Sequence, residues 1–142
     1  MPTPQTSTGA ATQTAAQGIE DFFRSSGGVG VLLSHVKDFG LSNAQVEQLE
    51  ALRPQFELAR HDLQAALAKA ETQLRTVLQN ESAAESDVMA AIDAVARSQA
   101  DLLKMRYRNL QKARGLLNDD QRGKVRSFRR QQEQDKAAQR RQ

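Results

Sequence analysis

The feature that most constrains this chain is a run of apolar side chains that recur every three or four residues between positions 46 and 77. They are Val46, Leu49, Leu52, Phe56, Ala59, Leu63, Ala66, Ala70, Leu74 and Val77. A strand would require a spacing of two, so the pattern predicts one amphipathic helix with a single buried seam. A helix over residues 43–79 would be about 55 Å long at about 1.5 Å per residue. Pro54 interrupts this pattern without ending it, which predicts a kink, because proline removes a backbone donor and crowds the preceding turn.

A second long helix is predicted after a turn at residues 80–86, where Ser82 with Glu85 forms a capping box and Ser86 is a rival cap. Its apolar positions fall into two offset stripes. One stripe holds Val88, Ile92, Val95, Leu102 and Met105, and the other holds Leu103, Leu110 and Leu117. Two stripes predict packing against two neighbours, which are the first helix and either short flanking helices or a second copy. We therefore expect an all-α fold, a long antiparallel helical hairpin with short flanking helices (a four-helix hooked hairpin) that forms a homodimer.

The flanks of the hairpin are shorter and more polar. Residues 1–17 carry no charged and few apolar side chains, which is typical of a disordered leader. Helical pieces are expected at residues 18–24 and 29–39, with Gly40 at the position where a helix commonly ends in a left-handed residue. A last helix is expected from Asp119 to about Ala138. The expected organisation is a leader at 1–17, a hairpin domain at 18–130 and a basic fraying tail at 131–142.

Two five-residue stretches share one pattern at the starts of two predicted helices. Leu41-Ser42-Asn43-Ala44-Gln45 and Leu117-Asn118-Asp119-Asp120-Gln121 both read leucine, capping residue, two small or polar residues, glutamine. Around a helical hairpin, these stretches resemble the LTxxQ-motif family of periplasmic proteins, the Spy/CpxP/ZraP/CnrX-like group of the heavy-metal resistance type. Serine and asparagine stand where that family carries threonine, and both residues serve as caps. The motif residues are Leu41, Ser42, Gln45, Leu117, Asn118 and Gln121.

The resemblance implies a periplasmic stress-response protein that binds unfolded polypeptide or a sensor domain without ATP. The alternative that the resemblance implies is a metal-responsive sensor of the nickel, cobalt or zinc resistance type. The sequence begins without the basic and apolar regions of a signal peptide, so a cytoplasmic structural coiled-coil subunit is a third interpretation. No apolar stretch approaches the roughly 18 residues of a membrane span, so none is expected.

Charge is distributed unevenly along the chain. Residues 104–142 carry 13 Lys and Arg against 4 Asp and Glu, a balance of +9, whereas residues 1–103 sum to −6. A basic end on an acidic body favours an anionic partner. Few aromatic residues alternate with the arginines, which argues against nucleic acid. The residues predicted to contact a polypeptide partner are Arg106, Arg108, Arg122, Lys124, Arg126, Arg129 and Arg130.

Catalytic and metal chemistry have little support in the sequence. The absence of Cys excludes a thiolate nucleophile and a Cys-ligated zinc, and no phosphate loop or nucleophile arrangement is present. We therefore expect neither an enzyme nor a cofactor. The weak candidates for a metal ion are His35, Glu57 and His61, which are too few for a site within one chain. The interpretation we favour is that Glu57 pairs with His61 one helical turn away.

Overall fold

The computed structural model describes residues 18, 19, 23 and 28–141 of the chain. The predicted leader at 1–17 and most of the predicted helix at 18–24 lie outside the described residues. Within them, the chain forms helices and no strands, in the order α3 (Val29–Ser34), α4 (Val36–Phe39), α5 (Asn43–Gln79), α6 (Glu85–Gly115) and α7 (Asp119–Arg140). The all-α hairpin fold is therefore confirmed.

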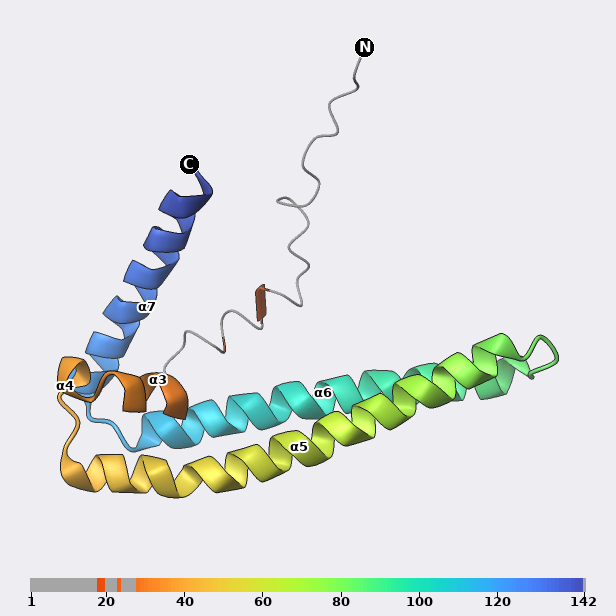
Figure 1. The fold of residues 1–142 in the computed structure, drawn as a ribbon, viewed down its shortest axis with the longest axis horizontal. Coiled ribbons are helices and arrows are strands. Elements are labelled where there is room, and N and C mark those ends of the chain that lie inside the picture. The colour runs from red at the N-terminus through yellow and green to blue at the C-terminus, as the bar shows by residue number, and fades with distance from the viewer. Residues whose placement is uncertain (1–17, 20–22, 24–27, 142) are drawn as a thin grey trace, which may run out of the picture.

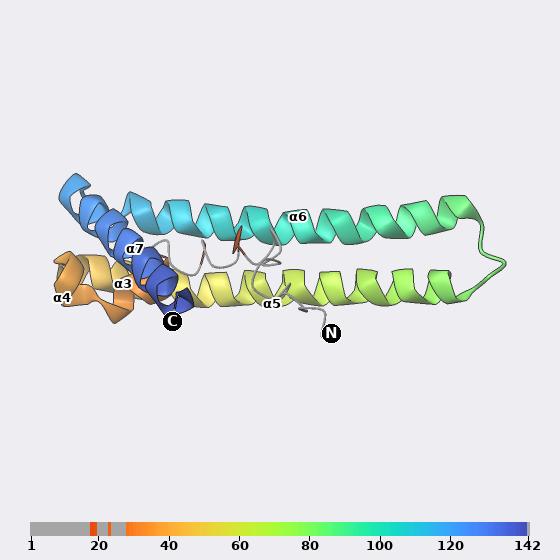
Figure 2. The same ribbon diagram turned by 90° about the horizontal axis from the view of Figure 1, so that it is seen from above.

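The two long helices α5 and α6 run side by side and are joined at the far end by a short loop (Figures 1 and 2). The predicted bounds of α5 match its observed ends. Its first residue follows Ser42, whose hydroxyl accepts from the Gln45 backbone N–H while the Gln45 side chain accepts from the Ser42 backbone N–H. Pro54 lies inside α5, and the helix continues through it. The ribbon of α5 bends gently in its first half, and no break occurs (Figure 1).

The start of α6 differs from the prediction. Neither Ser82 nor Ser86 caps the helix; Ala84 occupies the N-cap and provides no side-chain hydrogen bond. The turn is organised instead by Asn80, whose side-chain oxygen accepts from the Ser82 backbone N–H at 3.0 Å. Because Ser82 is held in this turn, the chain reaches helical geometry two residues later than its capping box would require.

The seams along the hairpin also depart from prediction at single positions. In α5, Ala66 is exposed and the neighbouring Leu67 turns partly inward. In α6, Ile92 and Met89 are exposed, whereas Leu102 and Met105 are buried against the hairpin partner. Seven residues fall about 20° short of two full turns of an ideal helix, so a long seam drifts to the neighbouring position.

The predicted helix at 29–39 is two helices. The backbone breaks at His35 (φ −131°, ψ 41°), and α4 ends at Gly40, which adopts the left-handed conformation predicted for it (φ 65°). The break directs α4 toward α7, where the rings of His35 and Phe39 lie 4.6 and 5.5 Å from the ring of Phe128. The periodicity of residues 29–39 does not predict this contact, because the contact is with a residue about ninety positions later in the chain.

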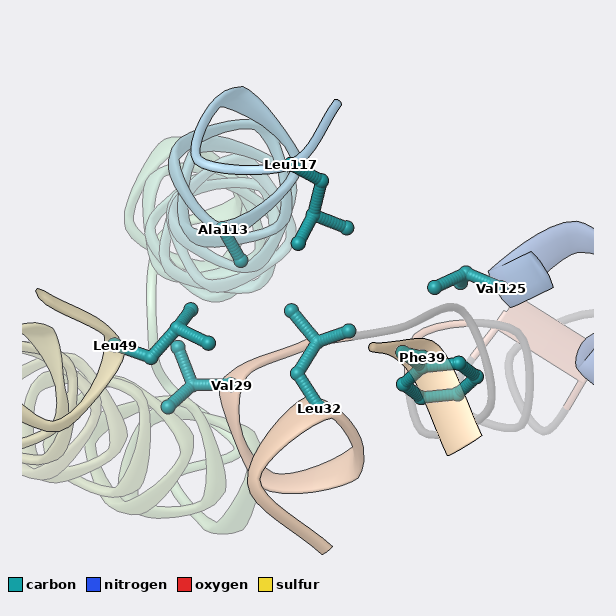
Figure 3. Packing of buried hydrophobic residues seen from close by; sticks show 7 residues of the cluster. All are labelled: Val29, Leu32, Phe39, Leu49, Ala113, Leu117 and Val125. Atoms are coloured by element: carbon teal, nitrogen blue, oxygen red, sulfur yellow. The ribbon is translucent and has the colours of Figure 1, made fainter. Parts of the chain in front are cut away.

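The hydrophobic core lies at the end of the hairpin that carries the short helices. Leu32 is fully buried at its centre, and side chains from α3, α4, α5, α6 and α7 surround it (Figure 3). The buried members are Val29, Leu32, Phe39, Leu49, Ala113, Leu117 and Val125. Every described helix therefore contributes to one cluster, which fixes the positions of the short helices on the hairpin.

Helix α7 crosses over this end and then rises away from the hairpin (Figures 1 and 2). Its first half is anchored by the buried Gln121 and Val125 and packs against α4. The segment 131–140, predicted as a fraying tail, continues the same helix as far as Arg140 and is almost entirely exposed. None of the described helices is both long and apolar enough to cross a bilayer.

Candidate functional site

The two motif glutamines meet in space and form a reciprocal amide pair. Gln45 Nε2 donates to Gln121 Oε1 at 2.8 Å, and Gln121 Nε2 donates to Gln45 Oε1 at 2.9 Å. Each amide also donates to a backbone carbonyl, from Gln45 to Leu116 and from Gln121 to Gly40. Each side-chain oxygen, in addition, accepts the backbone N–H of its own N-cap residue, Ser42 or Asn118.

This pair uses the full hydrogen-bonding capacity of both side chains. A glutamine amide has two donor hydrogens and an oxygen that accepts two bonds, and all of them are occupied here. Gln121 is also buried, with 6% of its surface exposed. The motif therefore joins the starts of α5 and α7 and holds them on the end of α6, and it leaves no group free to bind a ligand. Leu41 and Leu117 pack into the core on either side of it.

A hollow lined with arginines lies between the end of α6 and the flank of α7. Its volume is about 510 Å³, and its walls are Gln111, Arg114, Gly115, Leu117, Arg122, Val125, Arg126 and Arg129. No carboxylate lines it among the described residues. We call this feature the arginine hollow.

Helix geometry explains why three of its four arginines lie together. Arg122, Arg126 and Arg129 are spaced four and three residues apart, so they share one flank of α7. Arg122 is held by two bonds: its Nε donates to the carbonyl of Arg114 at 3.2 Å, and its Nη1 pairs with Asp119 at 2.9 Å. That carbonyl lies in the last turn of α6, where the helix dipole favours a cation.

Arg114 faces this flank from the other side of the turn. Its partial burial, together with the positive charges of Arg129 and Arg126, lowers the pKa of Arg114 below the usual value for an arginine. The guanidinium group remains charged at neutral pH, because arginine is not deprotonated in proteins. Burial disfavours this charge whatever the sign of its neighbours, whereas the contributions of Arg129 and Arg126 reflect the positive charge that these arginines add around the hollow.

The structure separates the seven predicted partner-binding residues. It brings Arg122, Arg126 and Arg129 to the arginine hollow, whereas Arg106 and Arg108 lie along the hairpin in other shallow depressions. Lys124 and Arg130 are exposed and do not line the hollow. The seven partner-binding residues predicted from the sequence do not include Arg114, Gln111 and Gly115, which line the hollow. The spacing of Arg122, Arg126 and Arg129 was visible in the sequence, but their approach to Arg114 depends on how the short turn folds α7 back.

The weak metal candidates do not converge. His35 Nδ1 lies 3.0 Å from Asp38 Oδ2, and Glu57 pairs with Arg60 at 2.6 Å rather than with His61. The favoured pairing of Glu57 with His61 was therefore wrong, since the arginine one turn away is the closer partner. In the part of the chain that the structure describes, no three His, Cys, Asp or Glu side chains are grouped in a way that would hold a metal ion.

The second apolar stripe of α6 is covered at one end and uncovered along the rest. Leu110 and Leu117 are buried where α3 packs on α6, whereas Leu103, one heptad earlier, is 38% exposed. Nearer the loop, Ile92, which the sequence assigned to the first stripe, and Met89 fall on the same side of the helix at 3.6 residues per turn and are 44% and 52% exposed. We call Met89, Ile92, Leu103 and Tyr107 the open stripe; it extends for about 27 Å along α6 at 1.5 Å per residue.

The fold and these surfaces define an all-α helical-hairpin protein with an exposed apolar stripe and a basic hollow. No known protein family, curated protein or solved structure matches the chain.

Proposed function

We propose that this chain is a periplasmic stress-response protein that binds unfolded polypeptide or a sensor domain, acts without catalysis and works as a homodimer. The observation that carries the proposal is the open stripe of α6. Large apolar side chains exposed along one face of a helix cost free energy in water, about 25 cal/mol per Å² of exposed apolar surface. Such a face is typical of a surface that another polypeptide covers.

Two features support an unfolded chain or a second copy as that polypeptide. The stripe is the continuation of a face that α3 covers within the same chain, so its chemistry suits a helix or an apolar segment. The basic side chains along and beyond it, including Arg106 and Arg108, complement the acidic segments of a polypeptide client. The periplasmic location follows from the resemblance of the two motif stretches to the LTxxQ family.

The test replaces Ile92 and Leu103 together with glutamate and compares this variant with Leu58→Glu. Leu58 is 64% exposed and lies between the seam positions Phe56 and Ala59 of α5. Leu58→Glu therefore replaces an exposed leucine with a charged residue on the other long helix, outside the open stripe. Sedimentation velocity reports the dimer, and light scattering of a thermally unfolded test enzyme reports client protection. We expect the double variant to be monomeric and to protect at least about tenfold less well, with Leu58→Glu unchanged.

Two results would contradict this proposal. If the wild-type chain sediments as a monomer at tens of micromolar, the proposed homodimer is wrong. If the wild type and the double variant protect the client equally, the open stripe is not the binding surface.

A structural coiled-coil subunit is the second candidate, in which the open stripe would pack against a helix of another subunit. It predicts that the double variant loses association while the wild type shows no protection of any client. The same two measurements therefore separate the two functions.

A further inference from the structure

We propose that the arginine hollow binds the free C-terminal carboxylate of a polypeptide whose last residue is apolar. The proposal deepens the function given above by naming the chemistry of one contact with the partner. It rests on that function only for the class of partner. Its residues lie at the end of α6 and on α7, and the hollow adjoins the last residue of the open stripe, because Gln111 on its wall donates to the hydroxyl of Tyr107.

The first argument is the unbalanced charge of the hollow. Of its four guanidinium groups, Arg122 is already bonded to the carbonyl of Arg114 and to Asp119. Neither Arg114 nor Arg126 has an ion pair with a carboxylate among the described residues. The planar fork of a guanidinium donates two parallel hydrogen bonds to a carboxylate, and such charge-assisted bonds are the stronger ones in proteins.

The second argument is the composition of the walls. Besides the arginines, Leu117 and Val125 line the hollow, so an apolar group sits within reach of the same cations. A C-terminal residue presents a carboxylate and a side chain from one Cα atom and satisfies both kinds of wall at once. A volume of about 510 Å³ accommodates one or two residues of that kind.

Nucleic acid fits these walls less well. Single-stranded nucleic acid is held by a charged track combined with aromatic side chains on which bases stack. The lining of the hollow contains no aromatic residue. An oligonucleotide is therefore an arm of the test and not the proposed ligand.

The experiment measures fluorescence anisotropy of labelled short peptides with the full chain. One peptide ends in leucine with a free carboxylate, a second is the same peptide amidated, and a third is amidated with an internal glutamate. The chain is compared with Arg126→Gln and with Arg130→Gln. These variants lose the same charge on the same exposed helix, but only Arg126 lines the hollow. Circular dichroism of both variants checks that the helices are retained.

We expect the free-carboxylate peptide to bind at least about tenfold more tightly than the amidated peptide. Arg126→Gln should remove most of that difference, and Arg130→Gln should change it less than about twofold. Higher salt should weaken binding of the free-carboxylate peptide in the wild type.

Four results would overturn the proposal. Equal binding of the free and amidated peptides would show that no terminal carboxylate is recognised. Equal binding of the internal-glutamate peptide would show that any carboxylate suffices. Equal losses in Arg126→Gln and Arg130→Gln would show a diffuse positive field, and tighter binding of a single-stranded oligonucleotide through Arg126 would assign the hollow to phosphate. Ile92 and Leu103, which test the open stripe, do not line the hollow, so the proposed function is tested separately.

Discussion

Gln45 and Gln121 show how one side chain can serve two levels of structure. Each closes a local capping box and, with the same amide, bonds to the other across 76 residues of sequence. Replacing a buried, fully bonded amide with an apolar group leaves its hydrogen-bond partners unsatisfied. The free-energy cost of a buried unsatisfied group is larger than the average contribution of a hydrogen bond to stability. We expect Gln121→Leu to lower the free energy of unfolding by about 2–4 kcal/mol, because the carbonyl of Gly40, the backbone N–H of Asn118 and the Gln45 amide each lose a partner.

Urea denaturation followed by circular dichroism measures this loss. Gln48→Leu is the control, since Gln48 is exposed on α5 and should change stability by less than about 0.5 kcal/mol. A loss for Gln121→Leu no larger than that of the control would show that the amide pair contributes only its local caps.

At this scale the sequence predicts local bonds and misses long-range ones. Ser42 and Asn118 are the caps that the sequence predicted, because a cap depends only on residues two or three positions apart. The capping box predicted at Ser82 and Glu85 does not form. The pairing of the two motif glutamines, and the approach of Arg114 to the flank of α7, depend on where whole helices lie. One local pairing was also wrong, because Arg60 and His61 both lie within one helical turn of Glu57 and the pair forms with Arg60.

At the scale of elements, α6 is the long helix with an unfilled N-cap. Ala84 occupies that position, so an N–H in the first turn lacks the side-chain acceptor that Ser42 and Asn118 give to α5 and α7. We expect Ala84→Ser to raise the free energy of unfolding by about 1 kcal/mol. Ala90→Ser, an exposed position inside α6, is the control and should be neutral or slightly destabilising. Thermal unfolding measures both, and a loss of stability in Ala84→Ser would mean that the turn at Asn80 is disturbed.

The long elements follow from the sequence, whereas the short ones do not. The bounds of α5 were predictable because a seam of ten apolar positions begins at a capping box. The split between α3 and α4 was not, because helices of six and four residues are held by packing rather than by propensity. At the break, the ring of His35 contacts the ring of Phe128. This contact requires α7 to be in place, so the local sequence does not reveal it.

Over the whole molecule, burial is concentrated at one end. The core cluster joins α3, α4, α5, α6 and α7 through residues 29–56 and 113–128. From residue 65 to residue 100, Ala70 is the one buried residue in the described chain. A segment with few buried contacts opens at a lower free energy than the core. The far half of the hairpin is therefore the part of α5 and α6 whose stability depends most on a partner.

Hydrogen exchange tests this dependence directly. In dilute protein, we expect amides of residues 65–98 to exchange at least about tenfold faster than those of residues 45–56 and 105–117, since their local opening costs less. Raising the concentration above the dissociation constant of the dimer should slow exchange in residues 86–107, which carry the open stripe, and leave the core segments unchanged. The Ile92→Glu, Leu103→Glu double variant should lose that slowing and keep the difference between the two ends. Uniform protection along α5 and α6 in dilute protein would mean that the far half of the hairpin is stable without a partner. The dependence of this half on a partner at the open stripe would then be wrong.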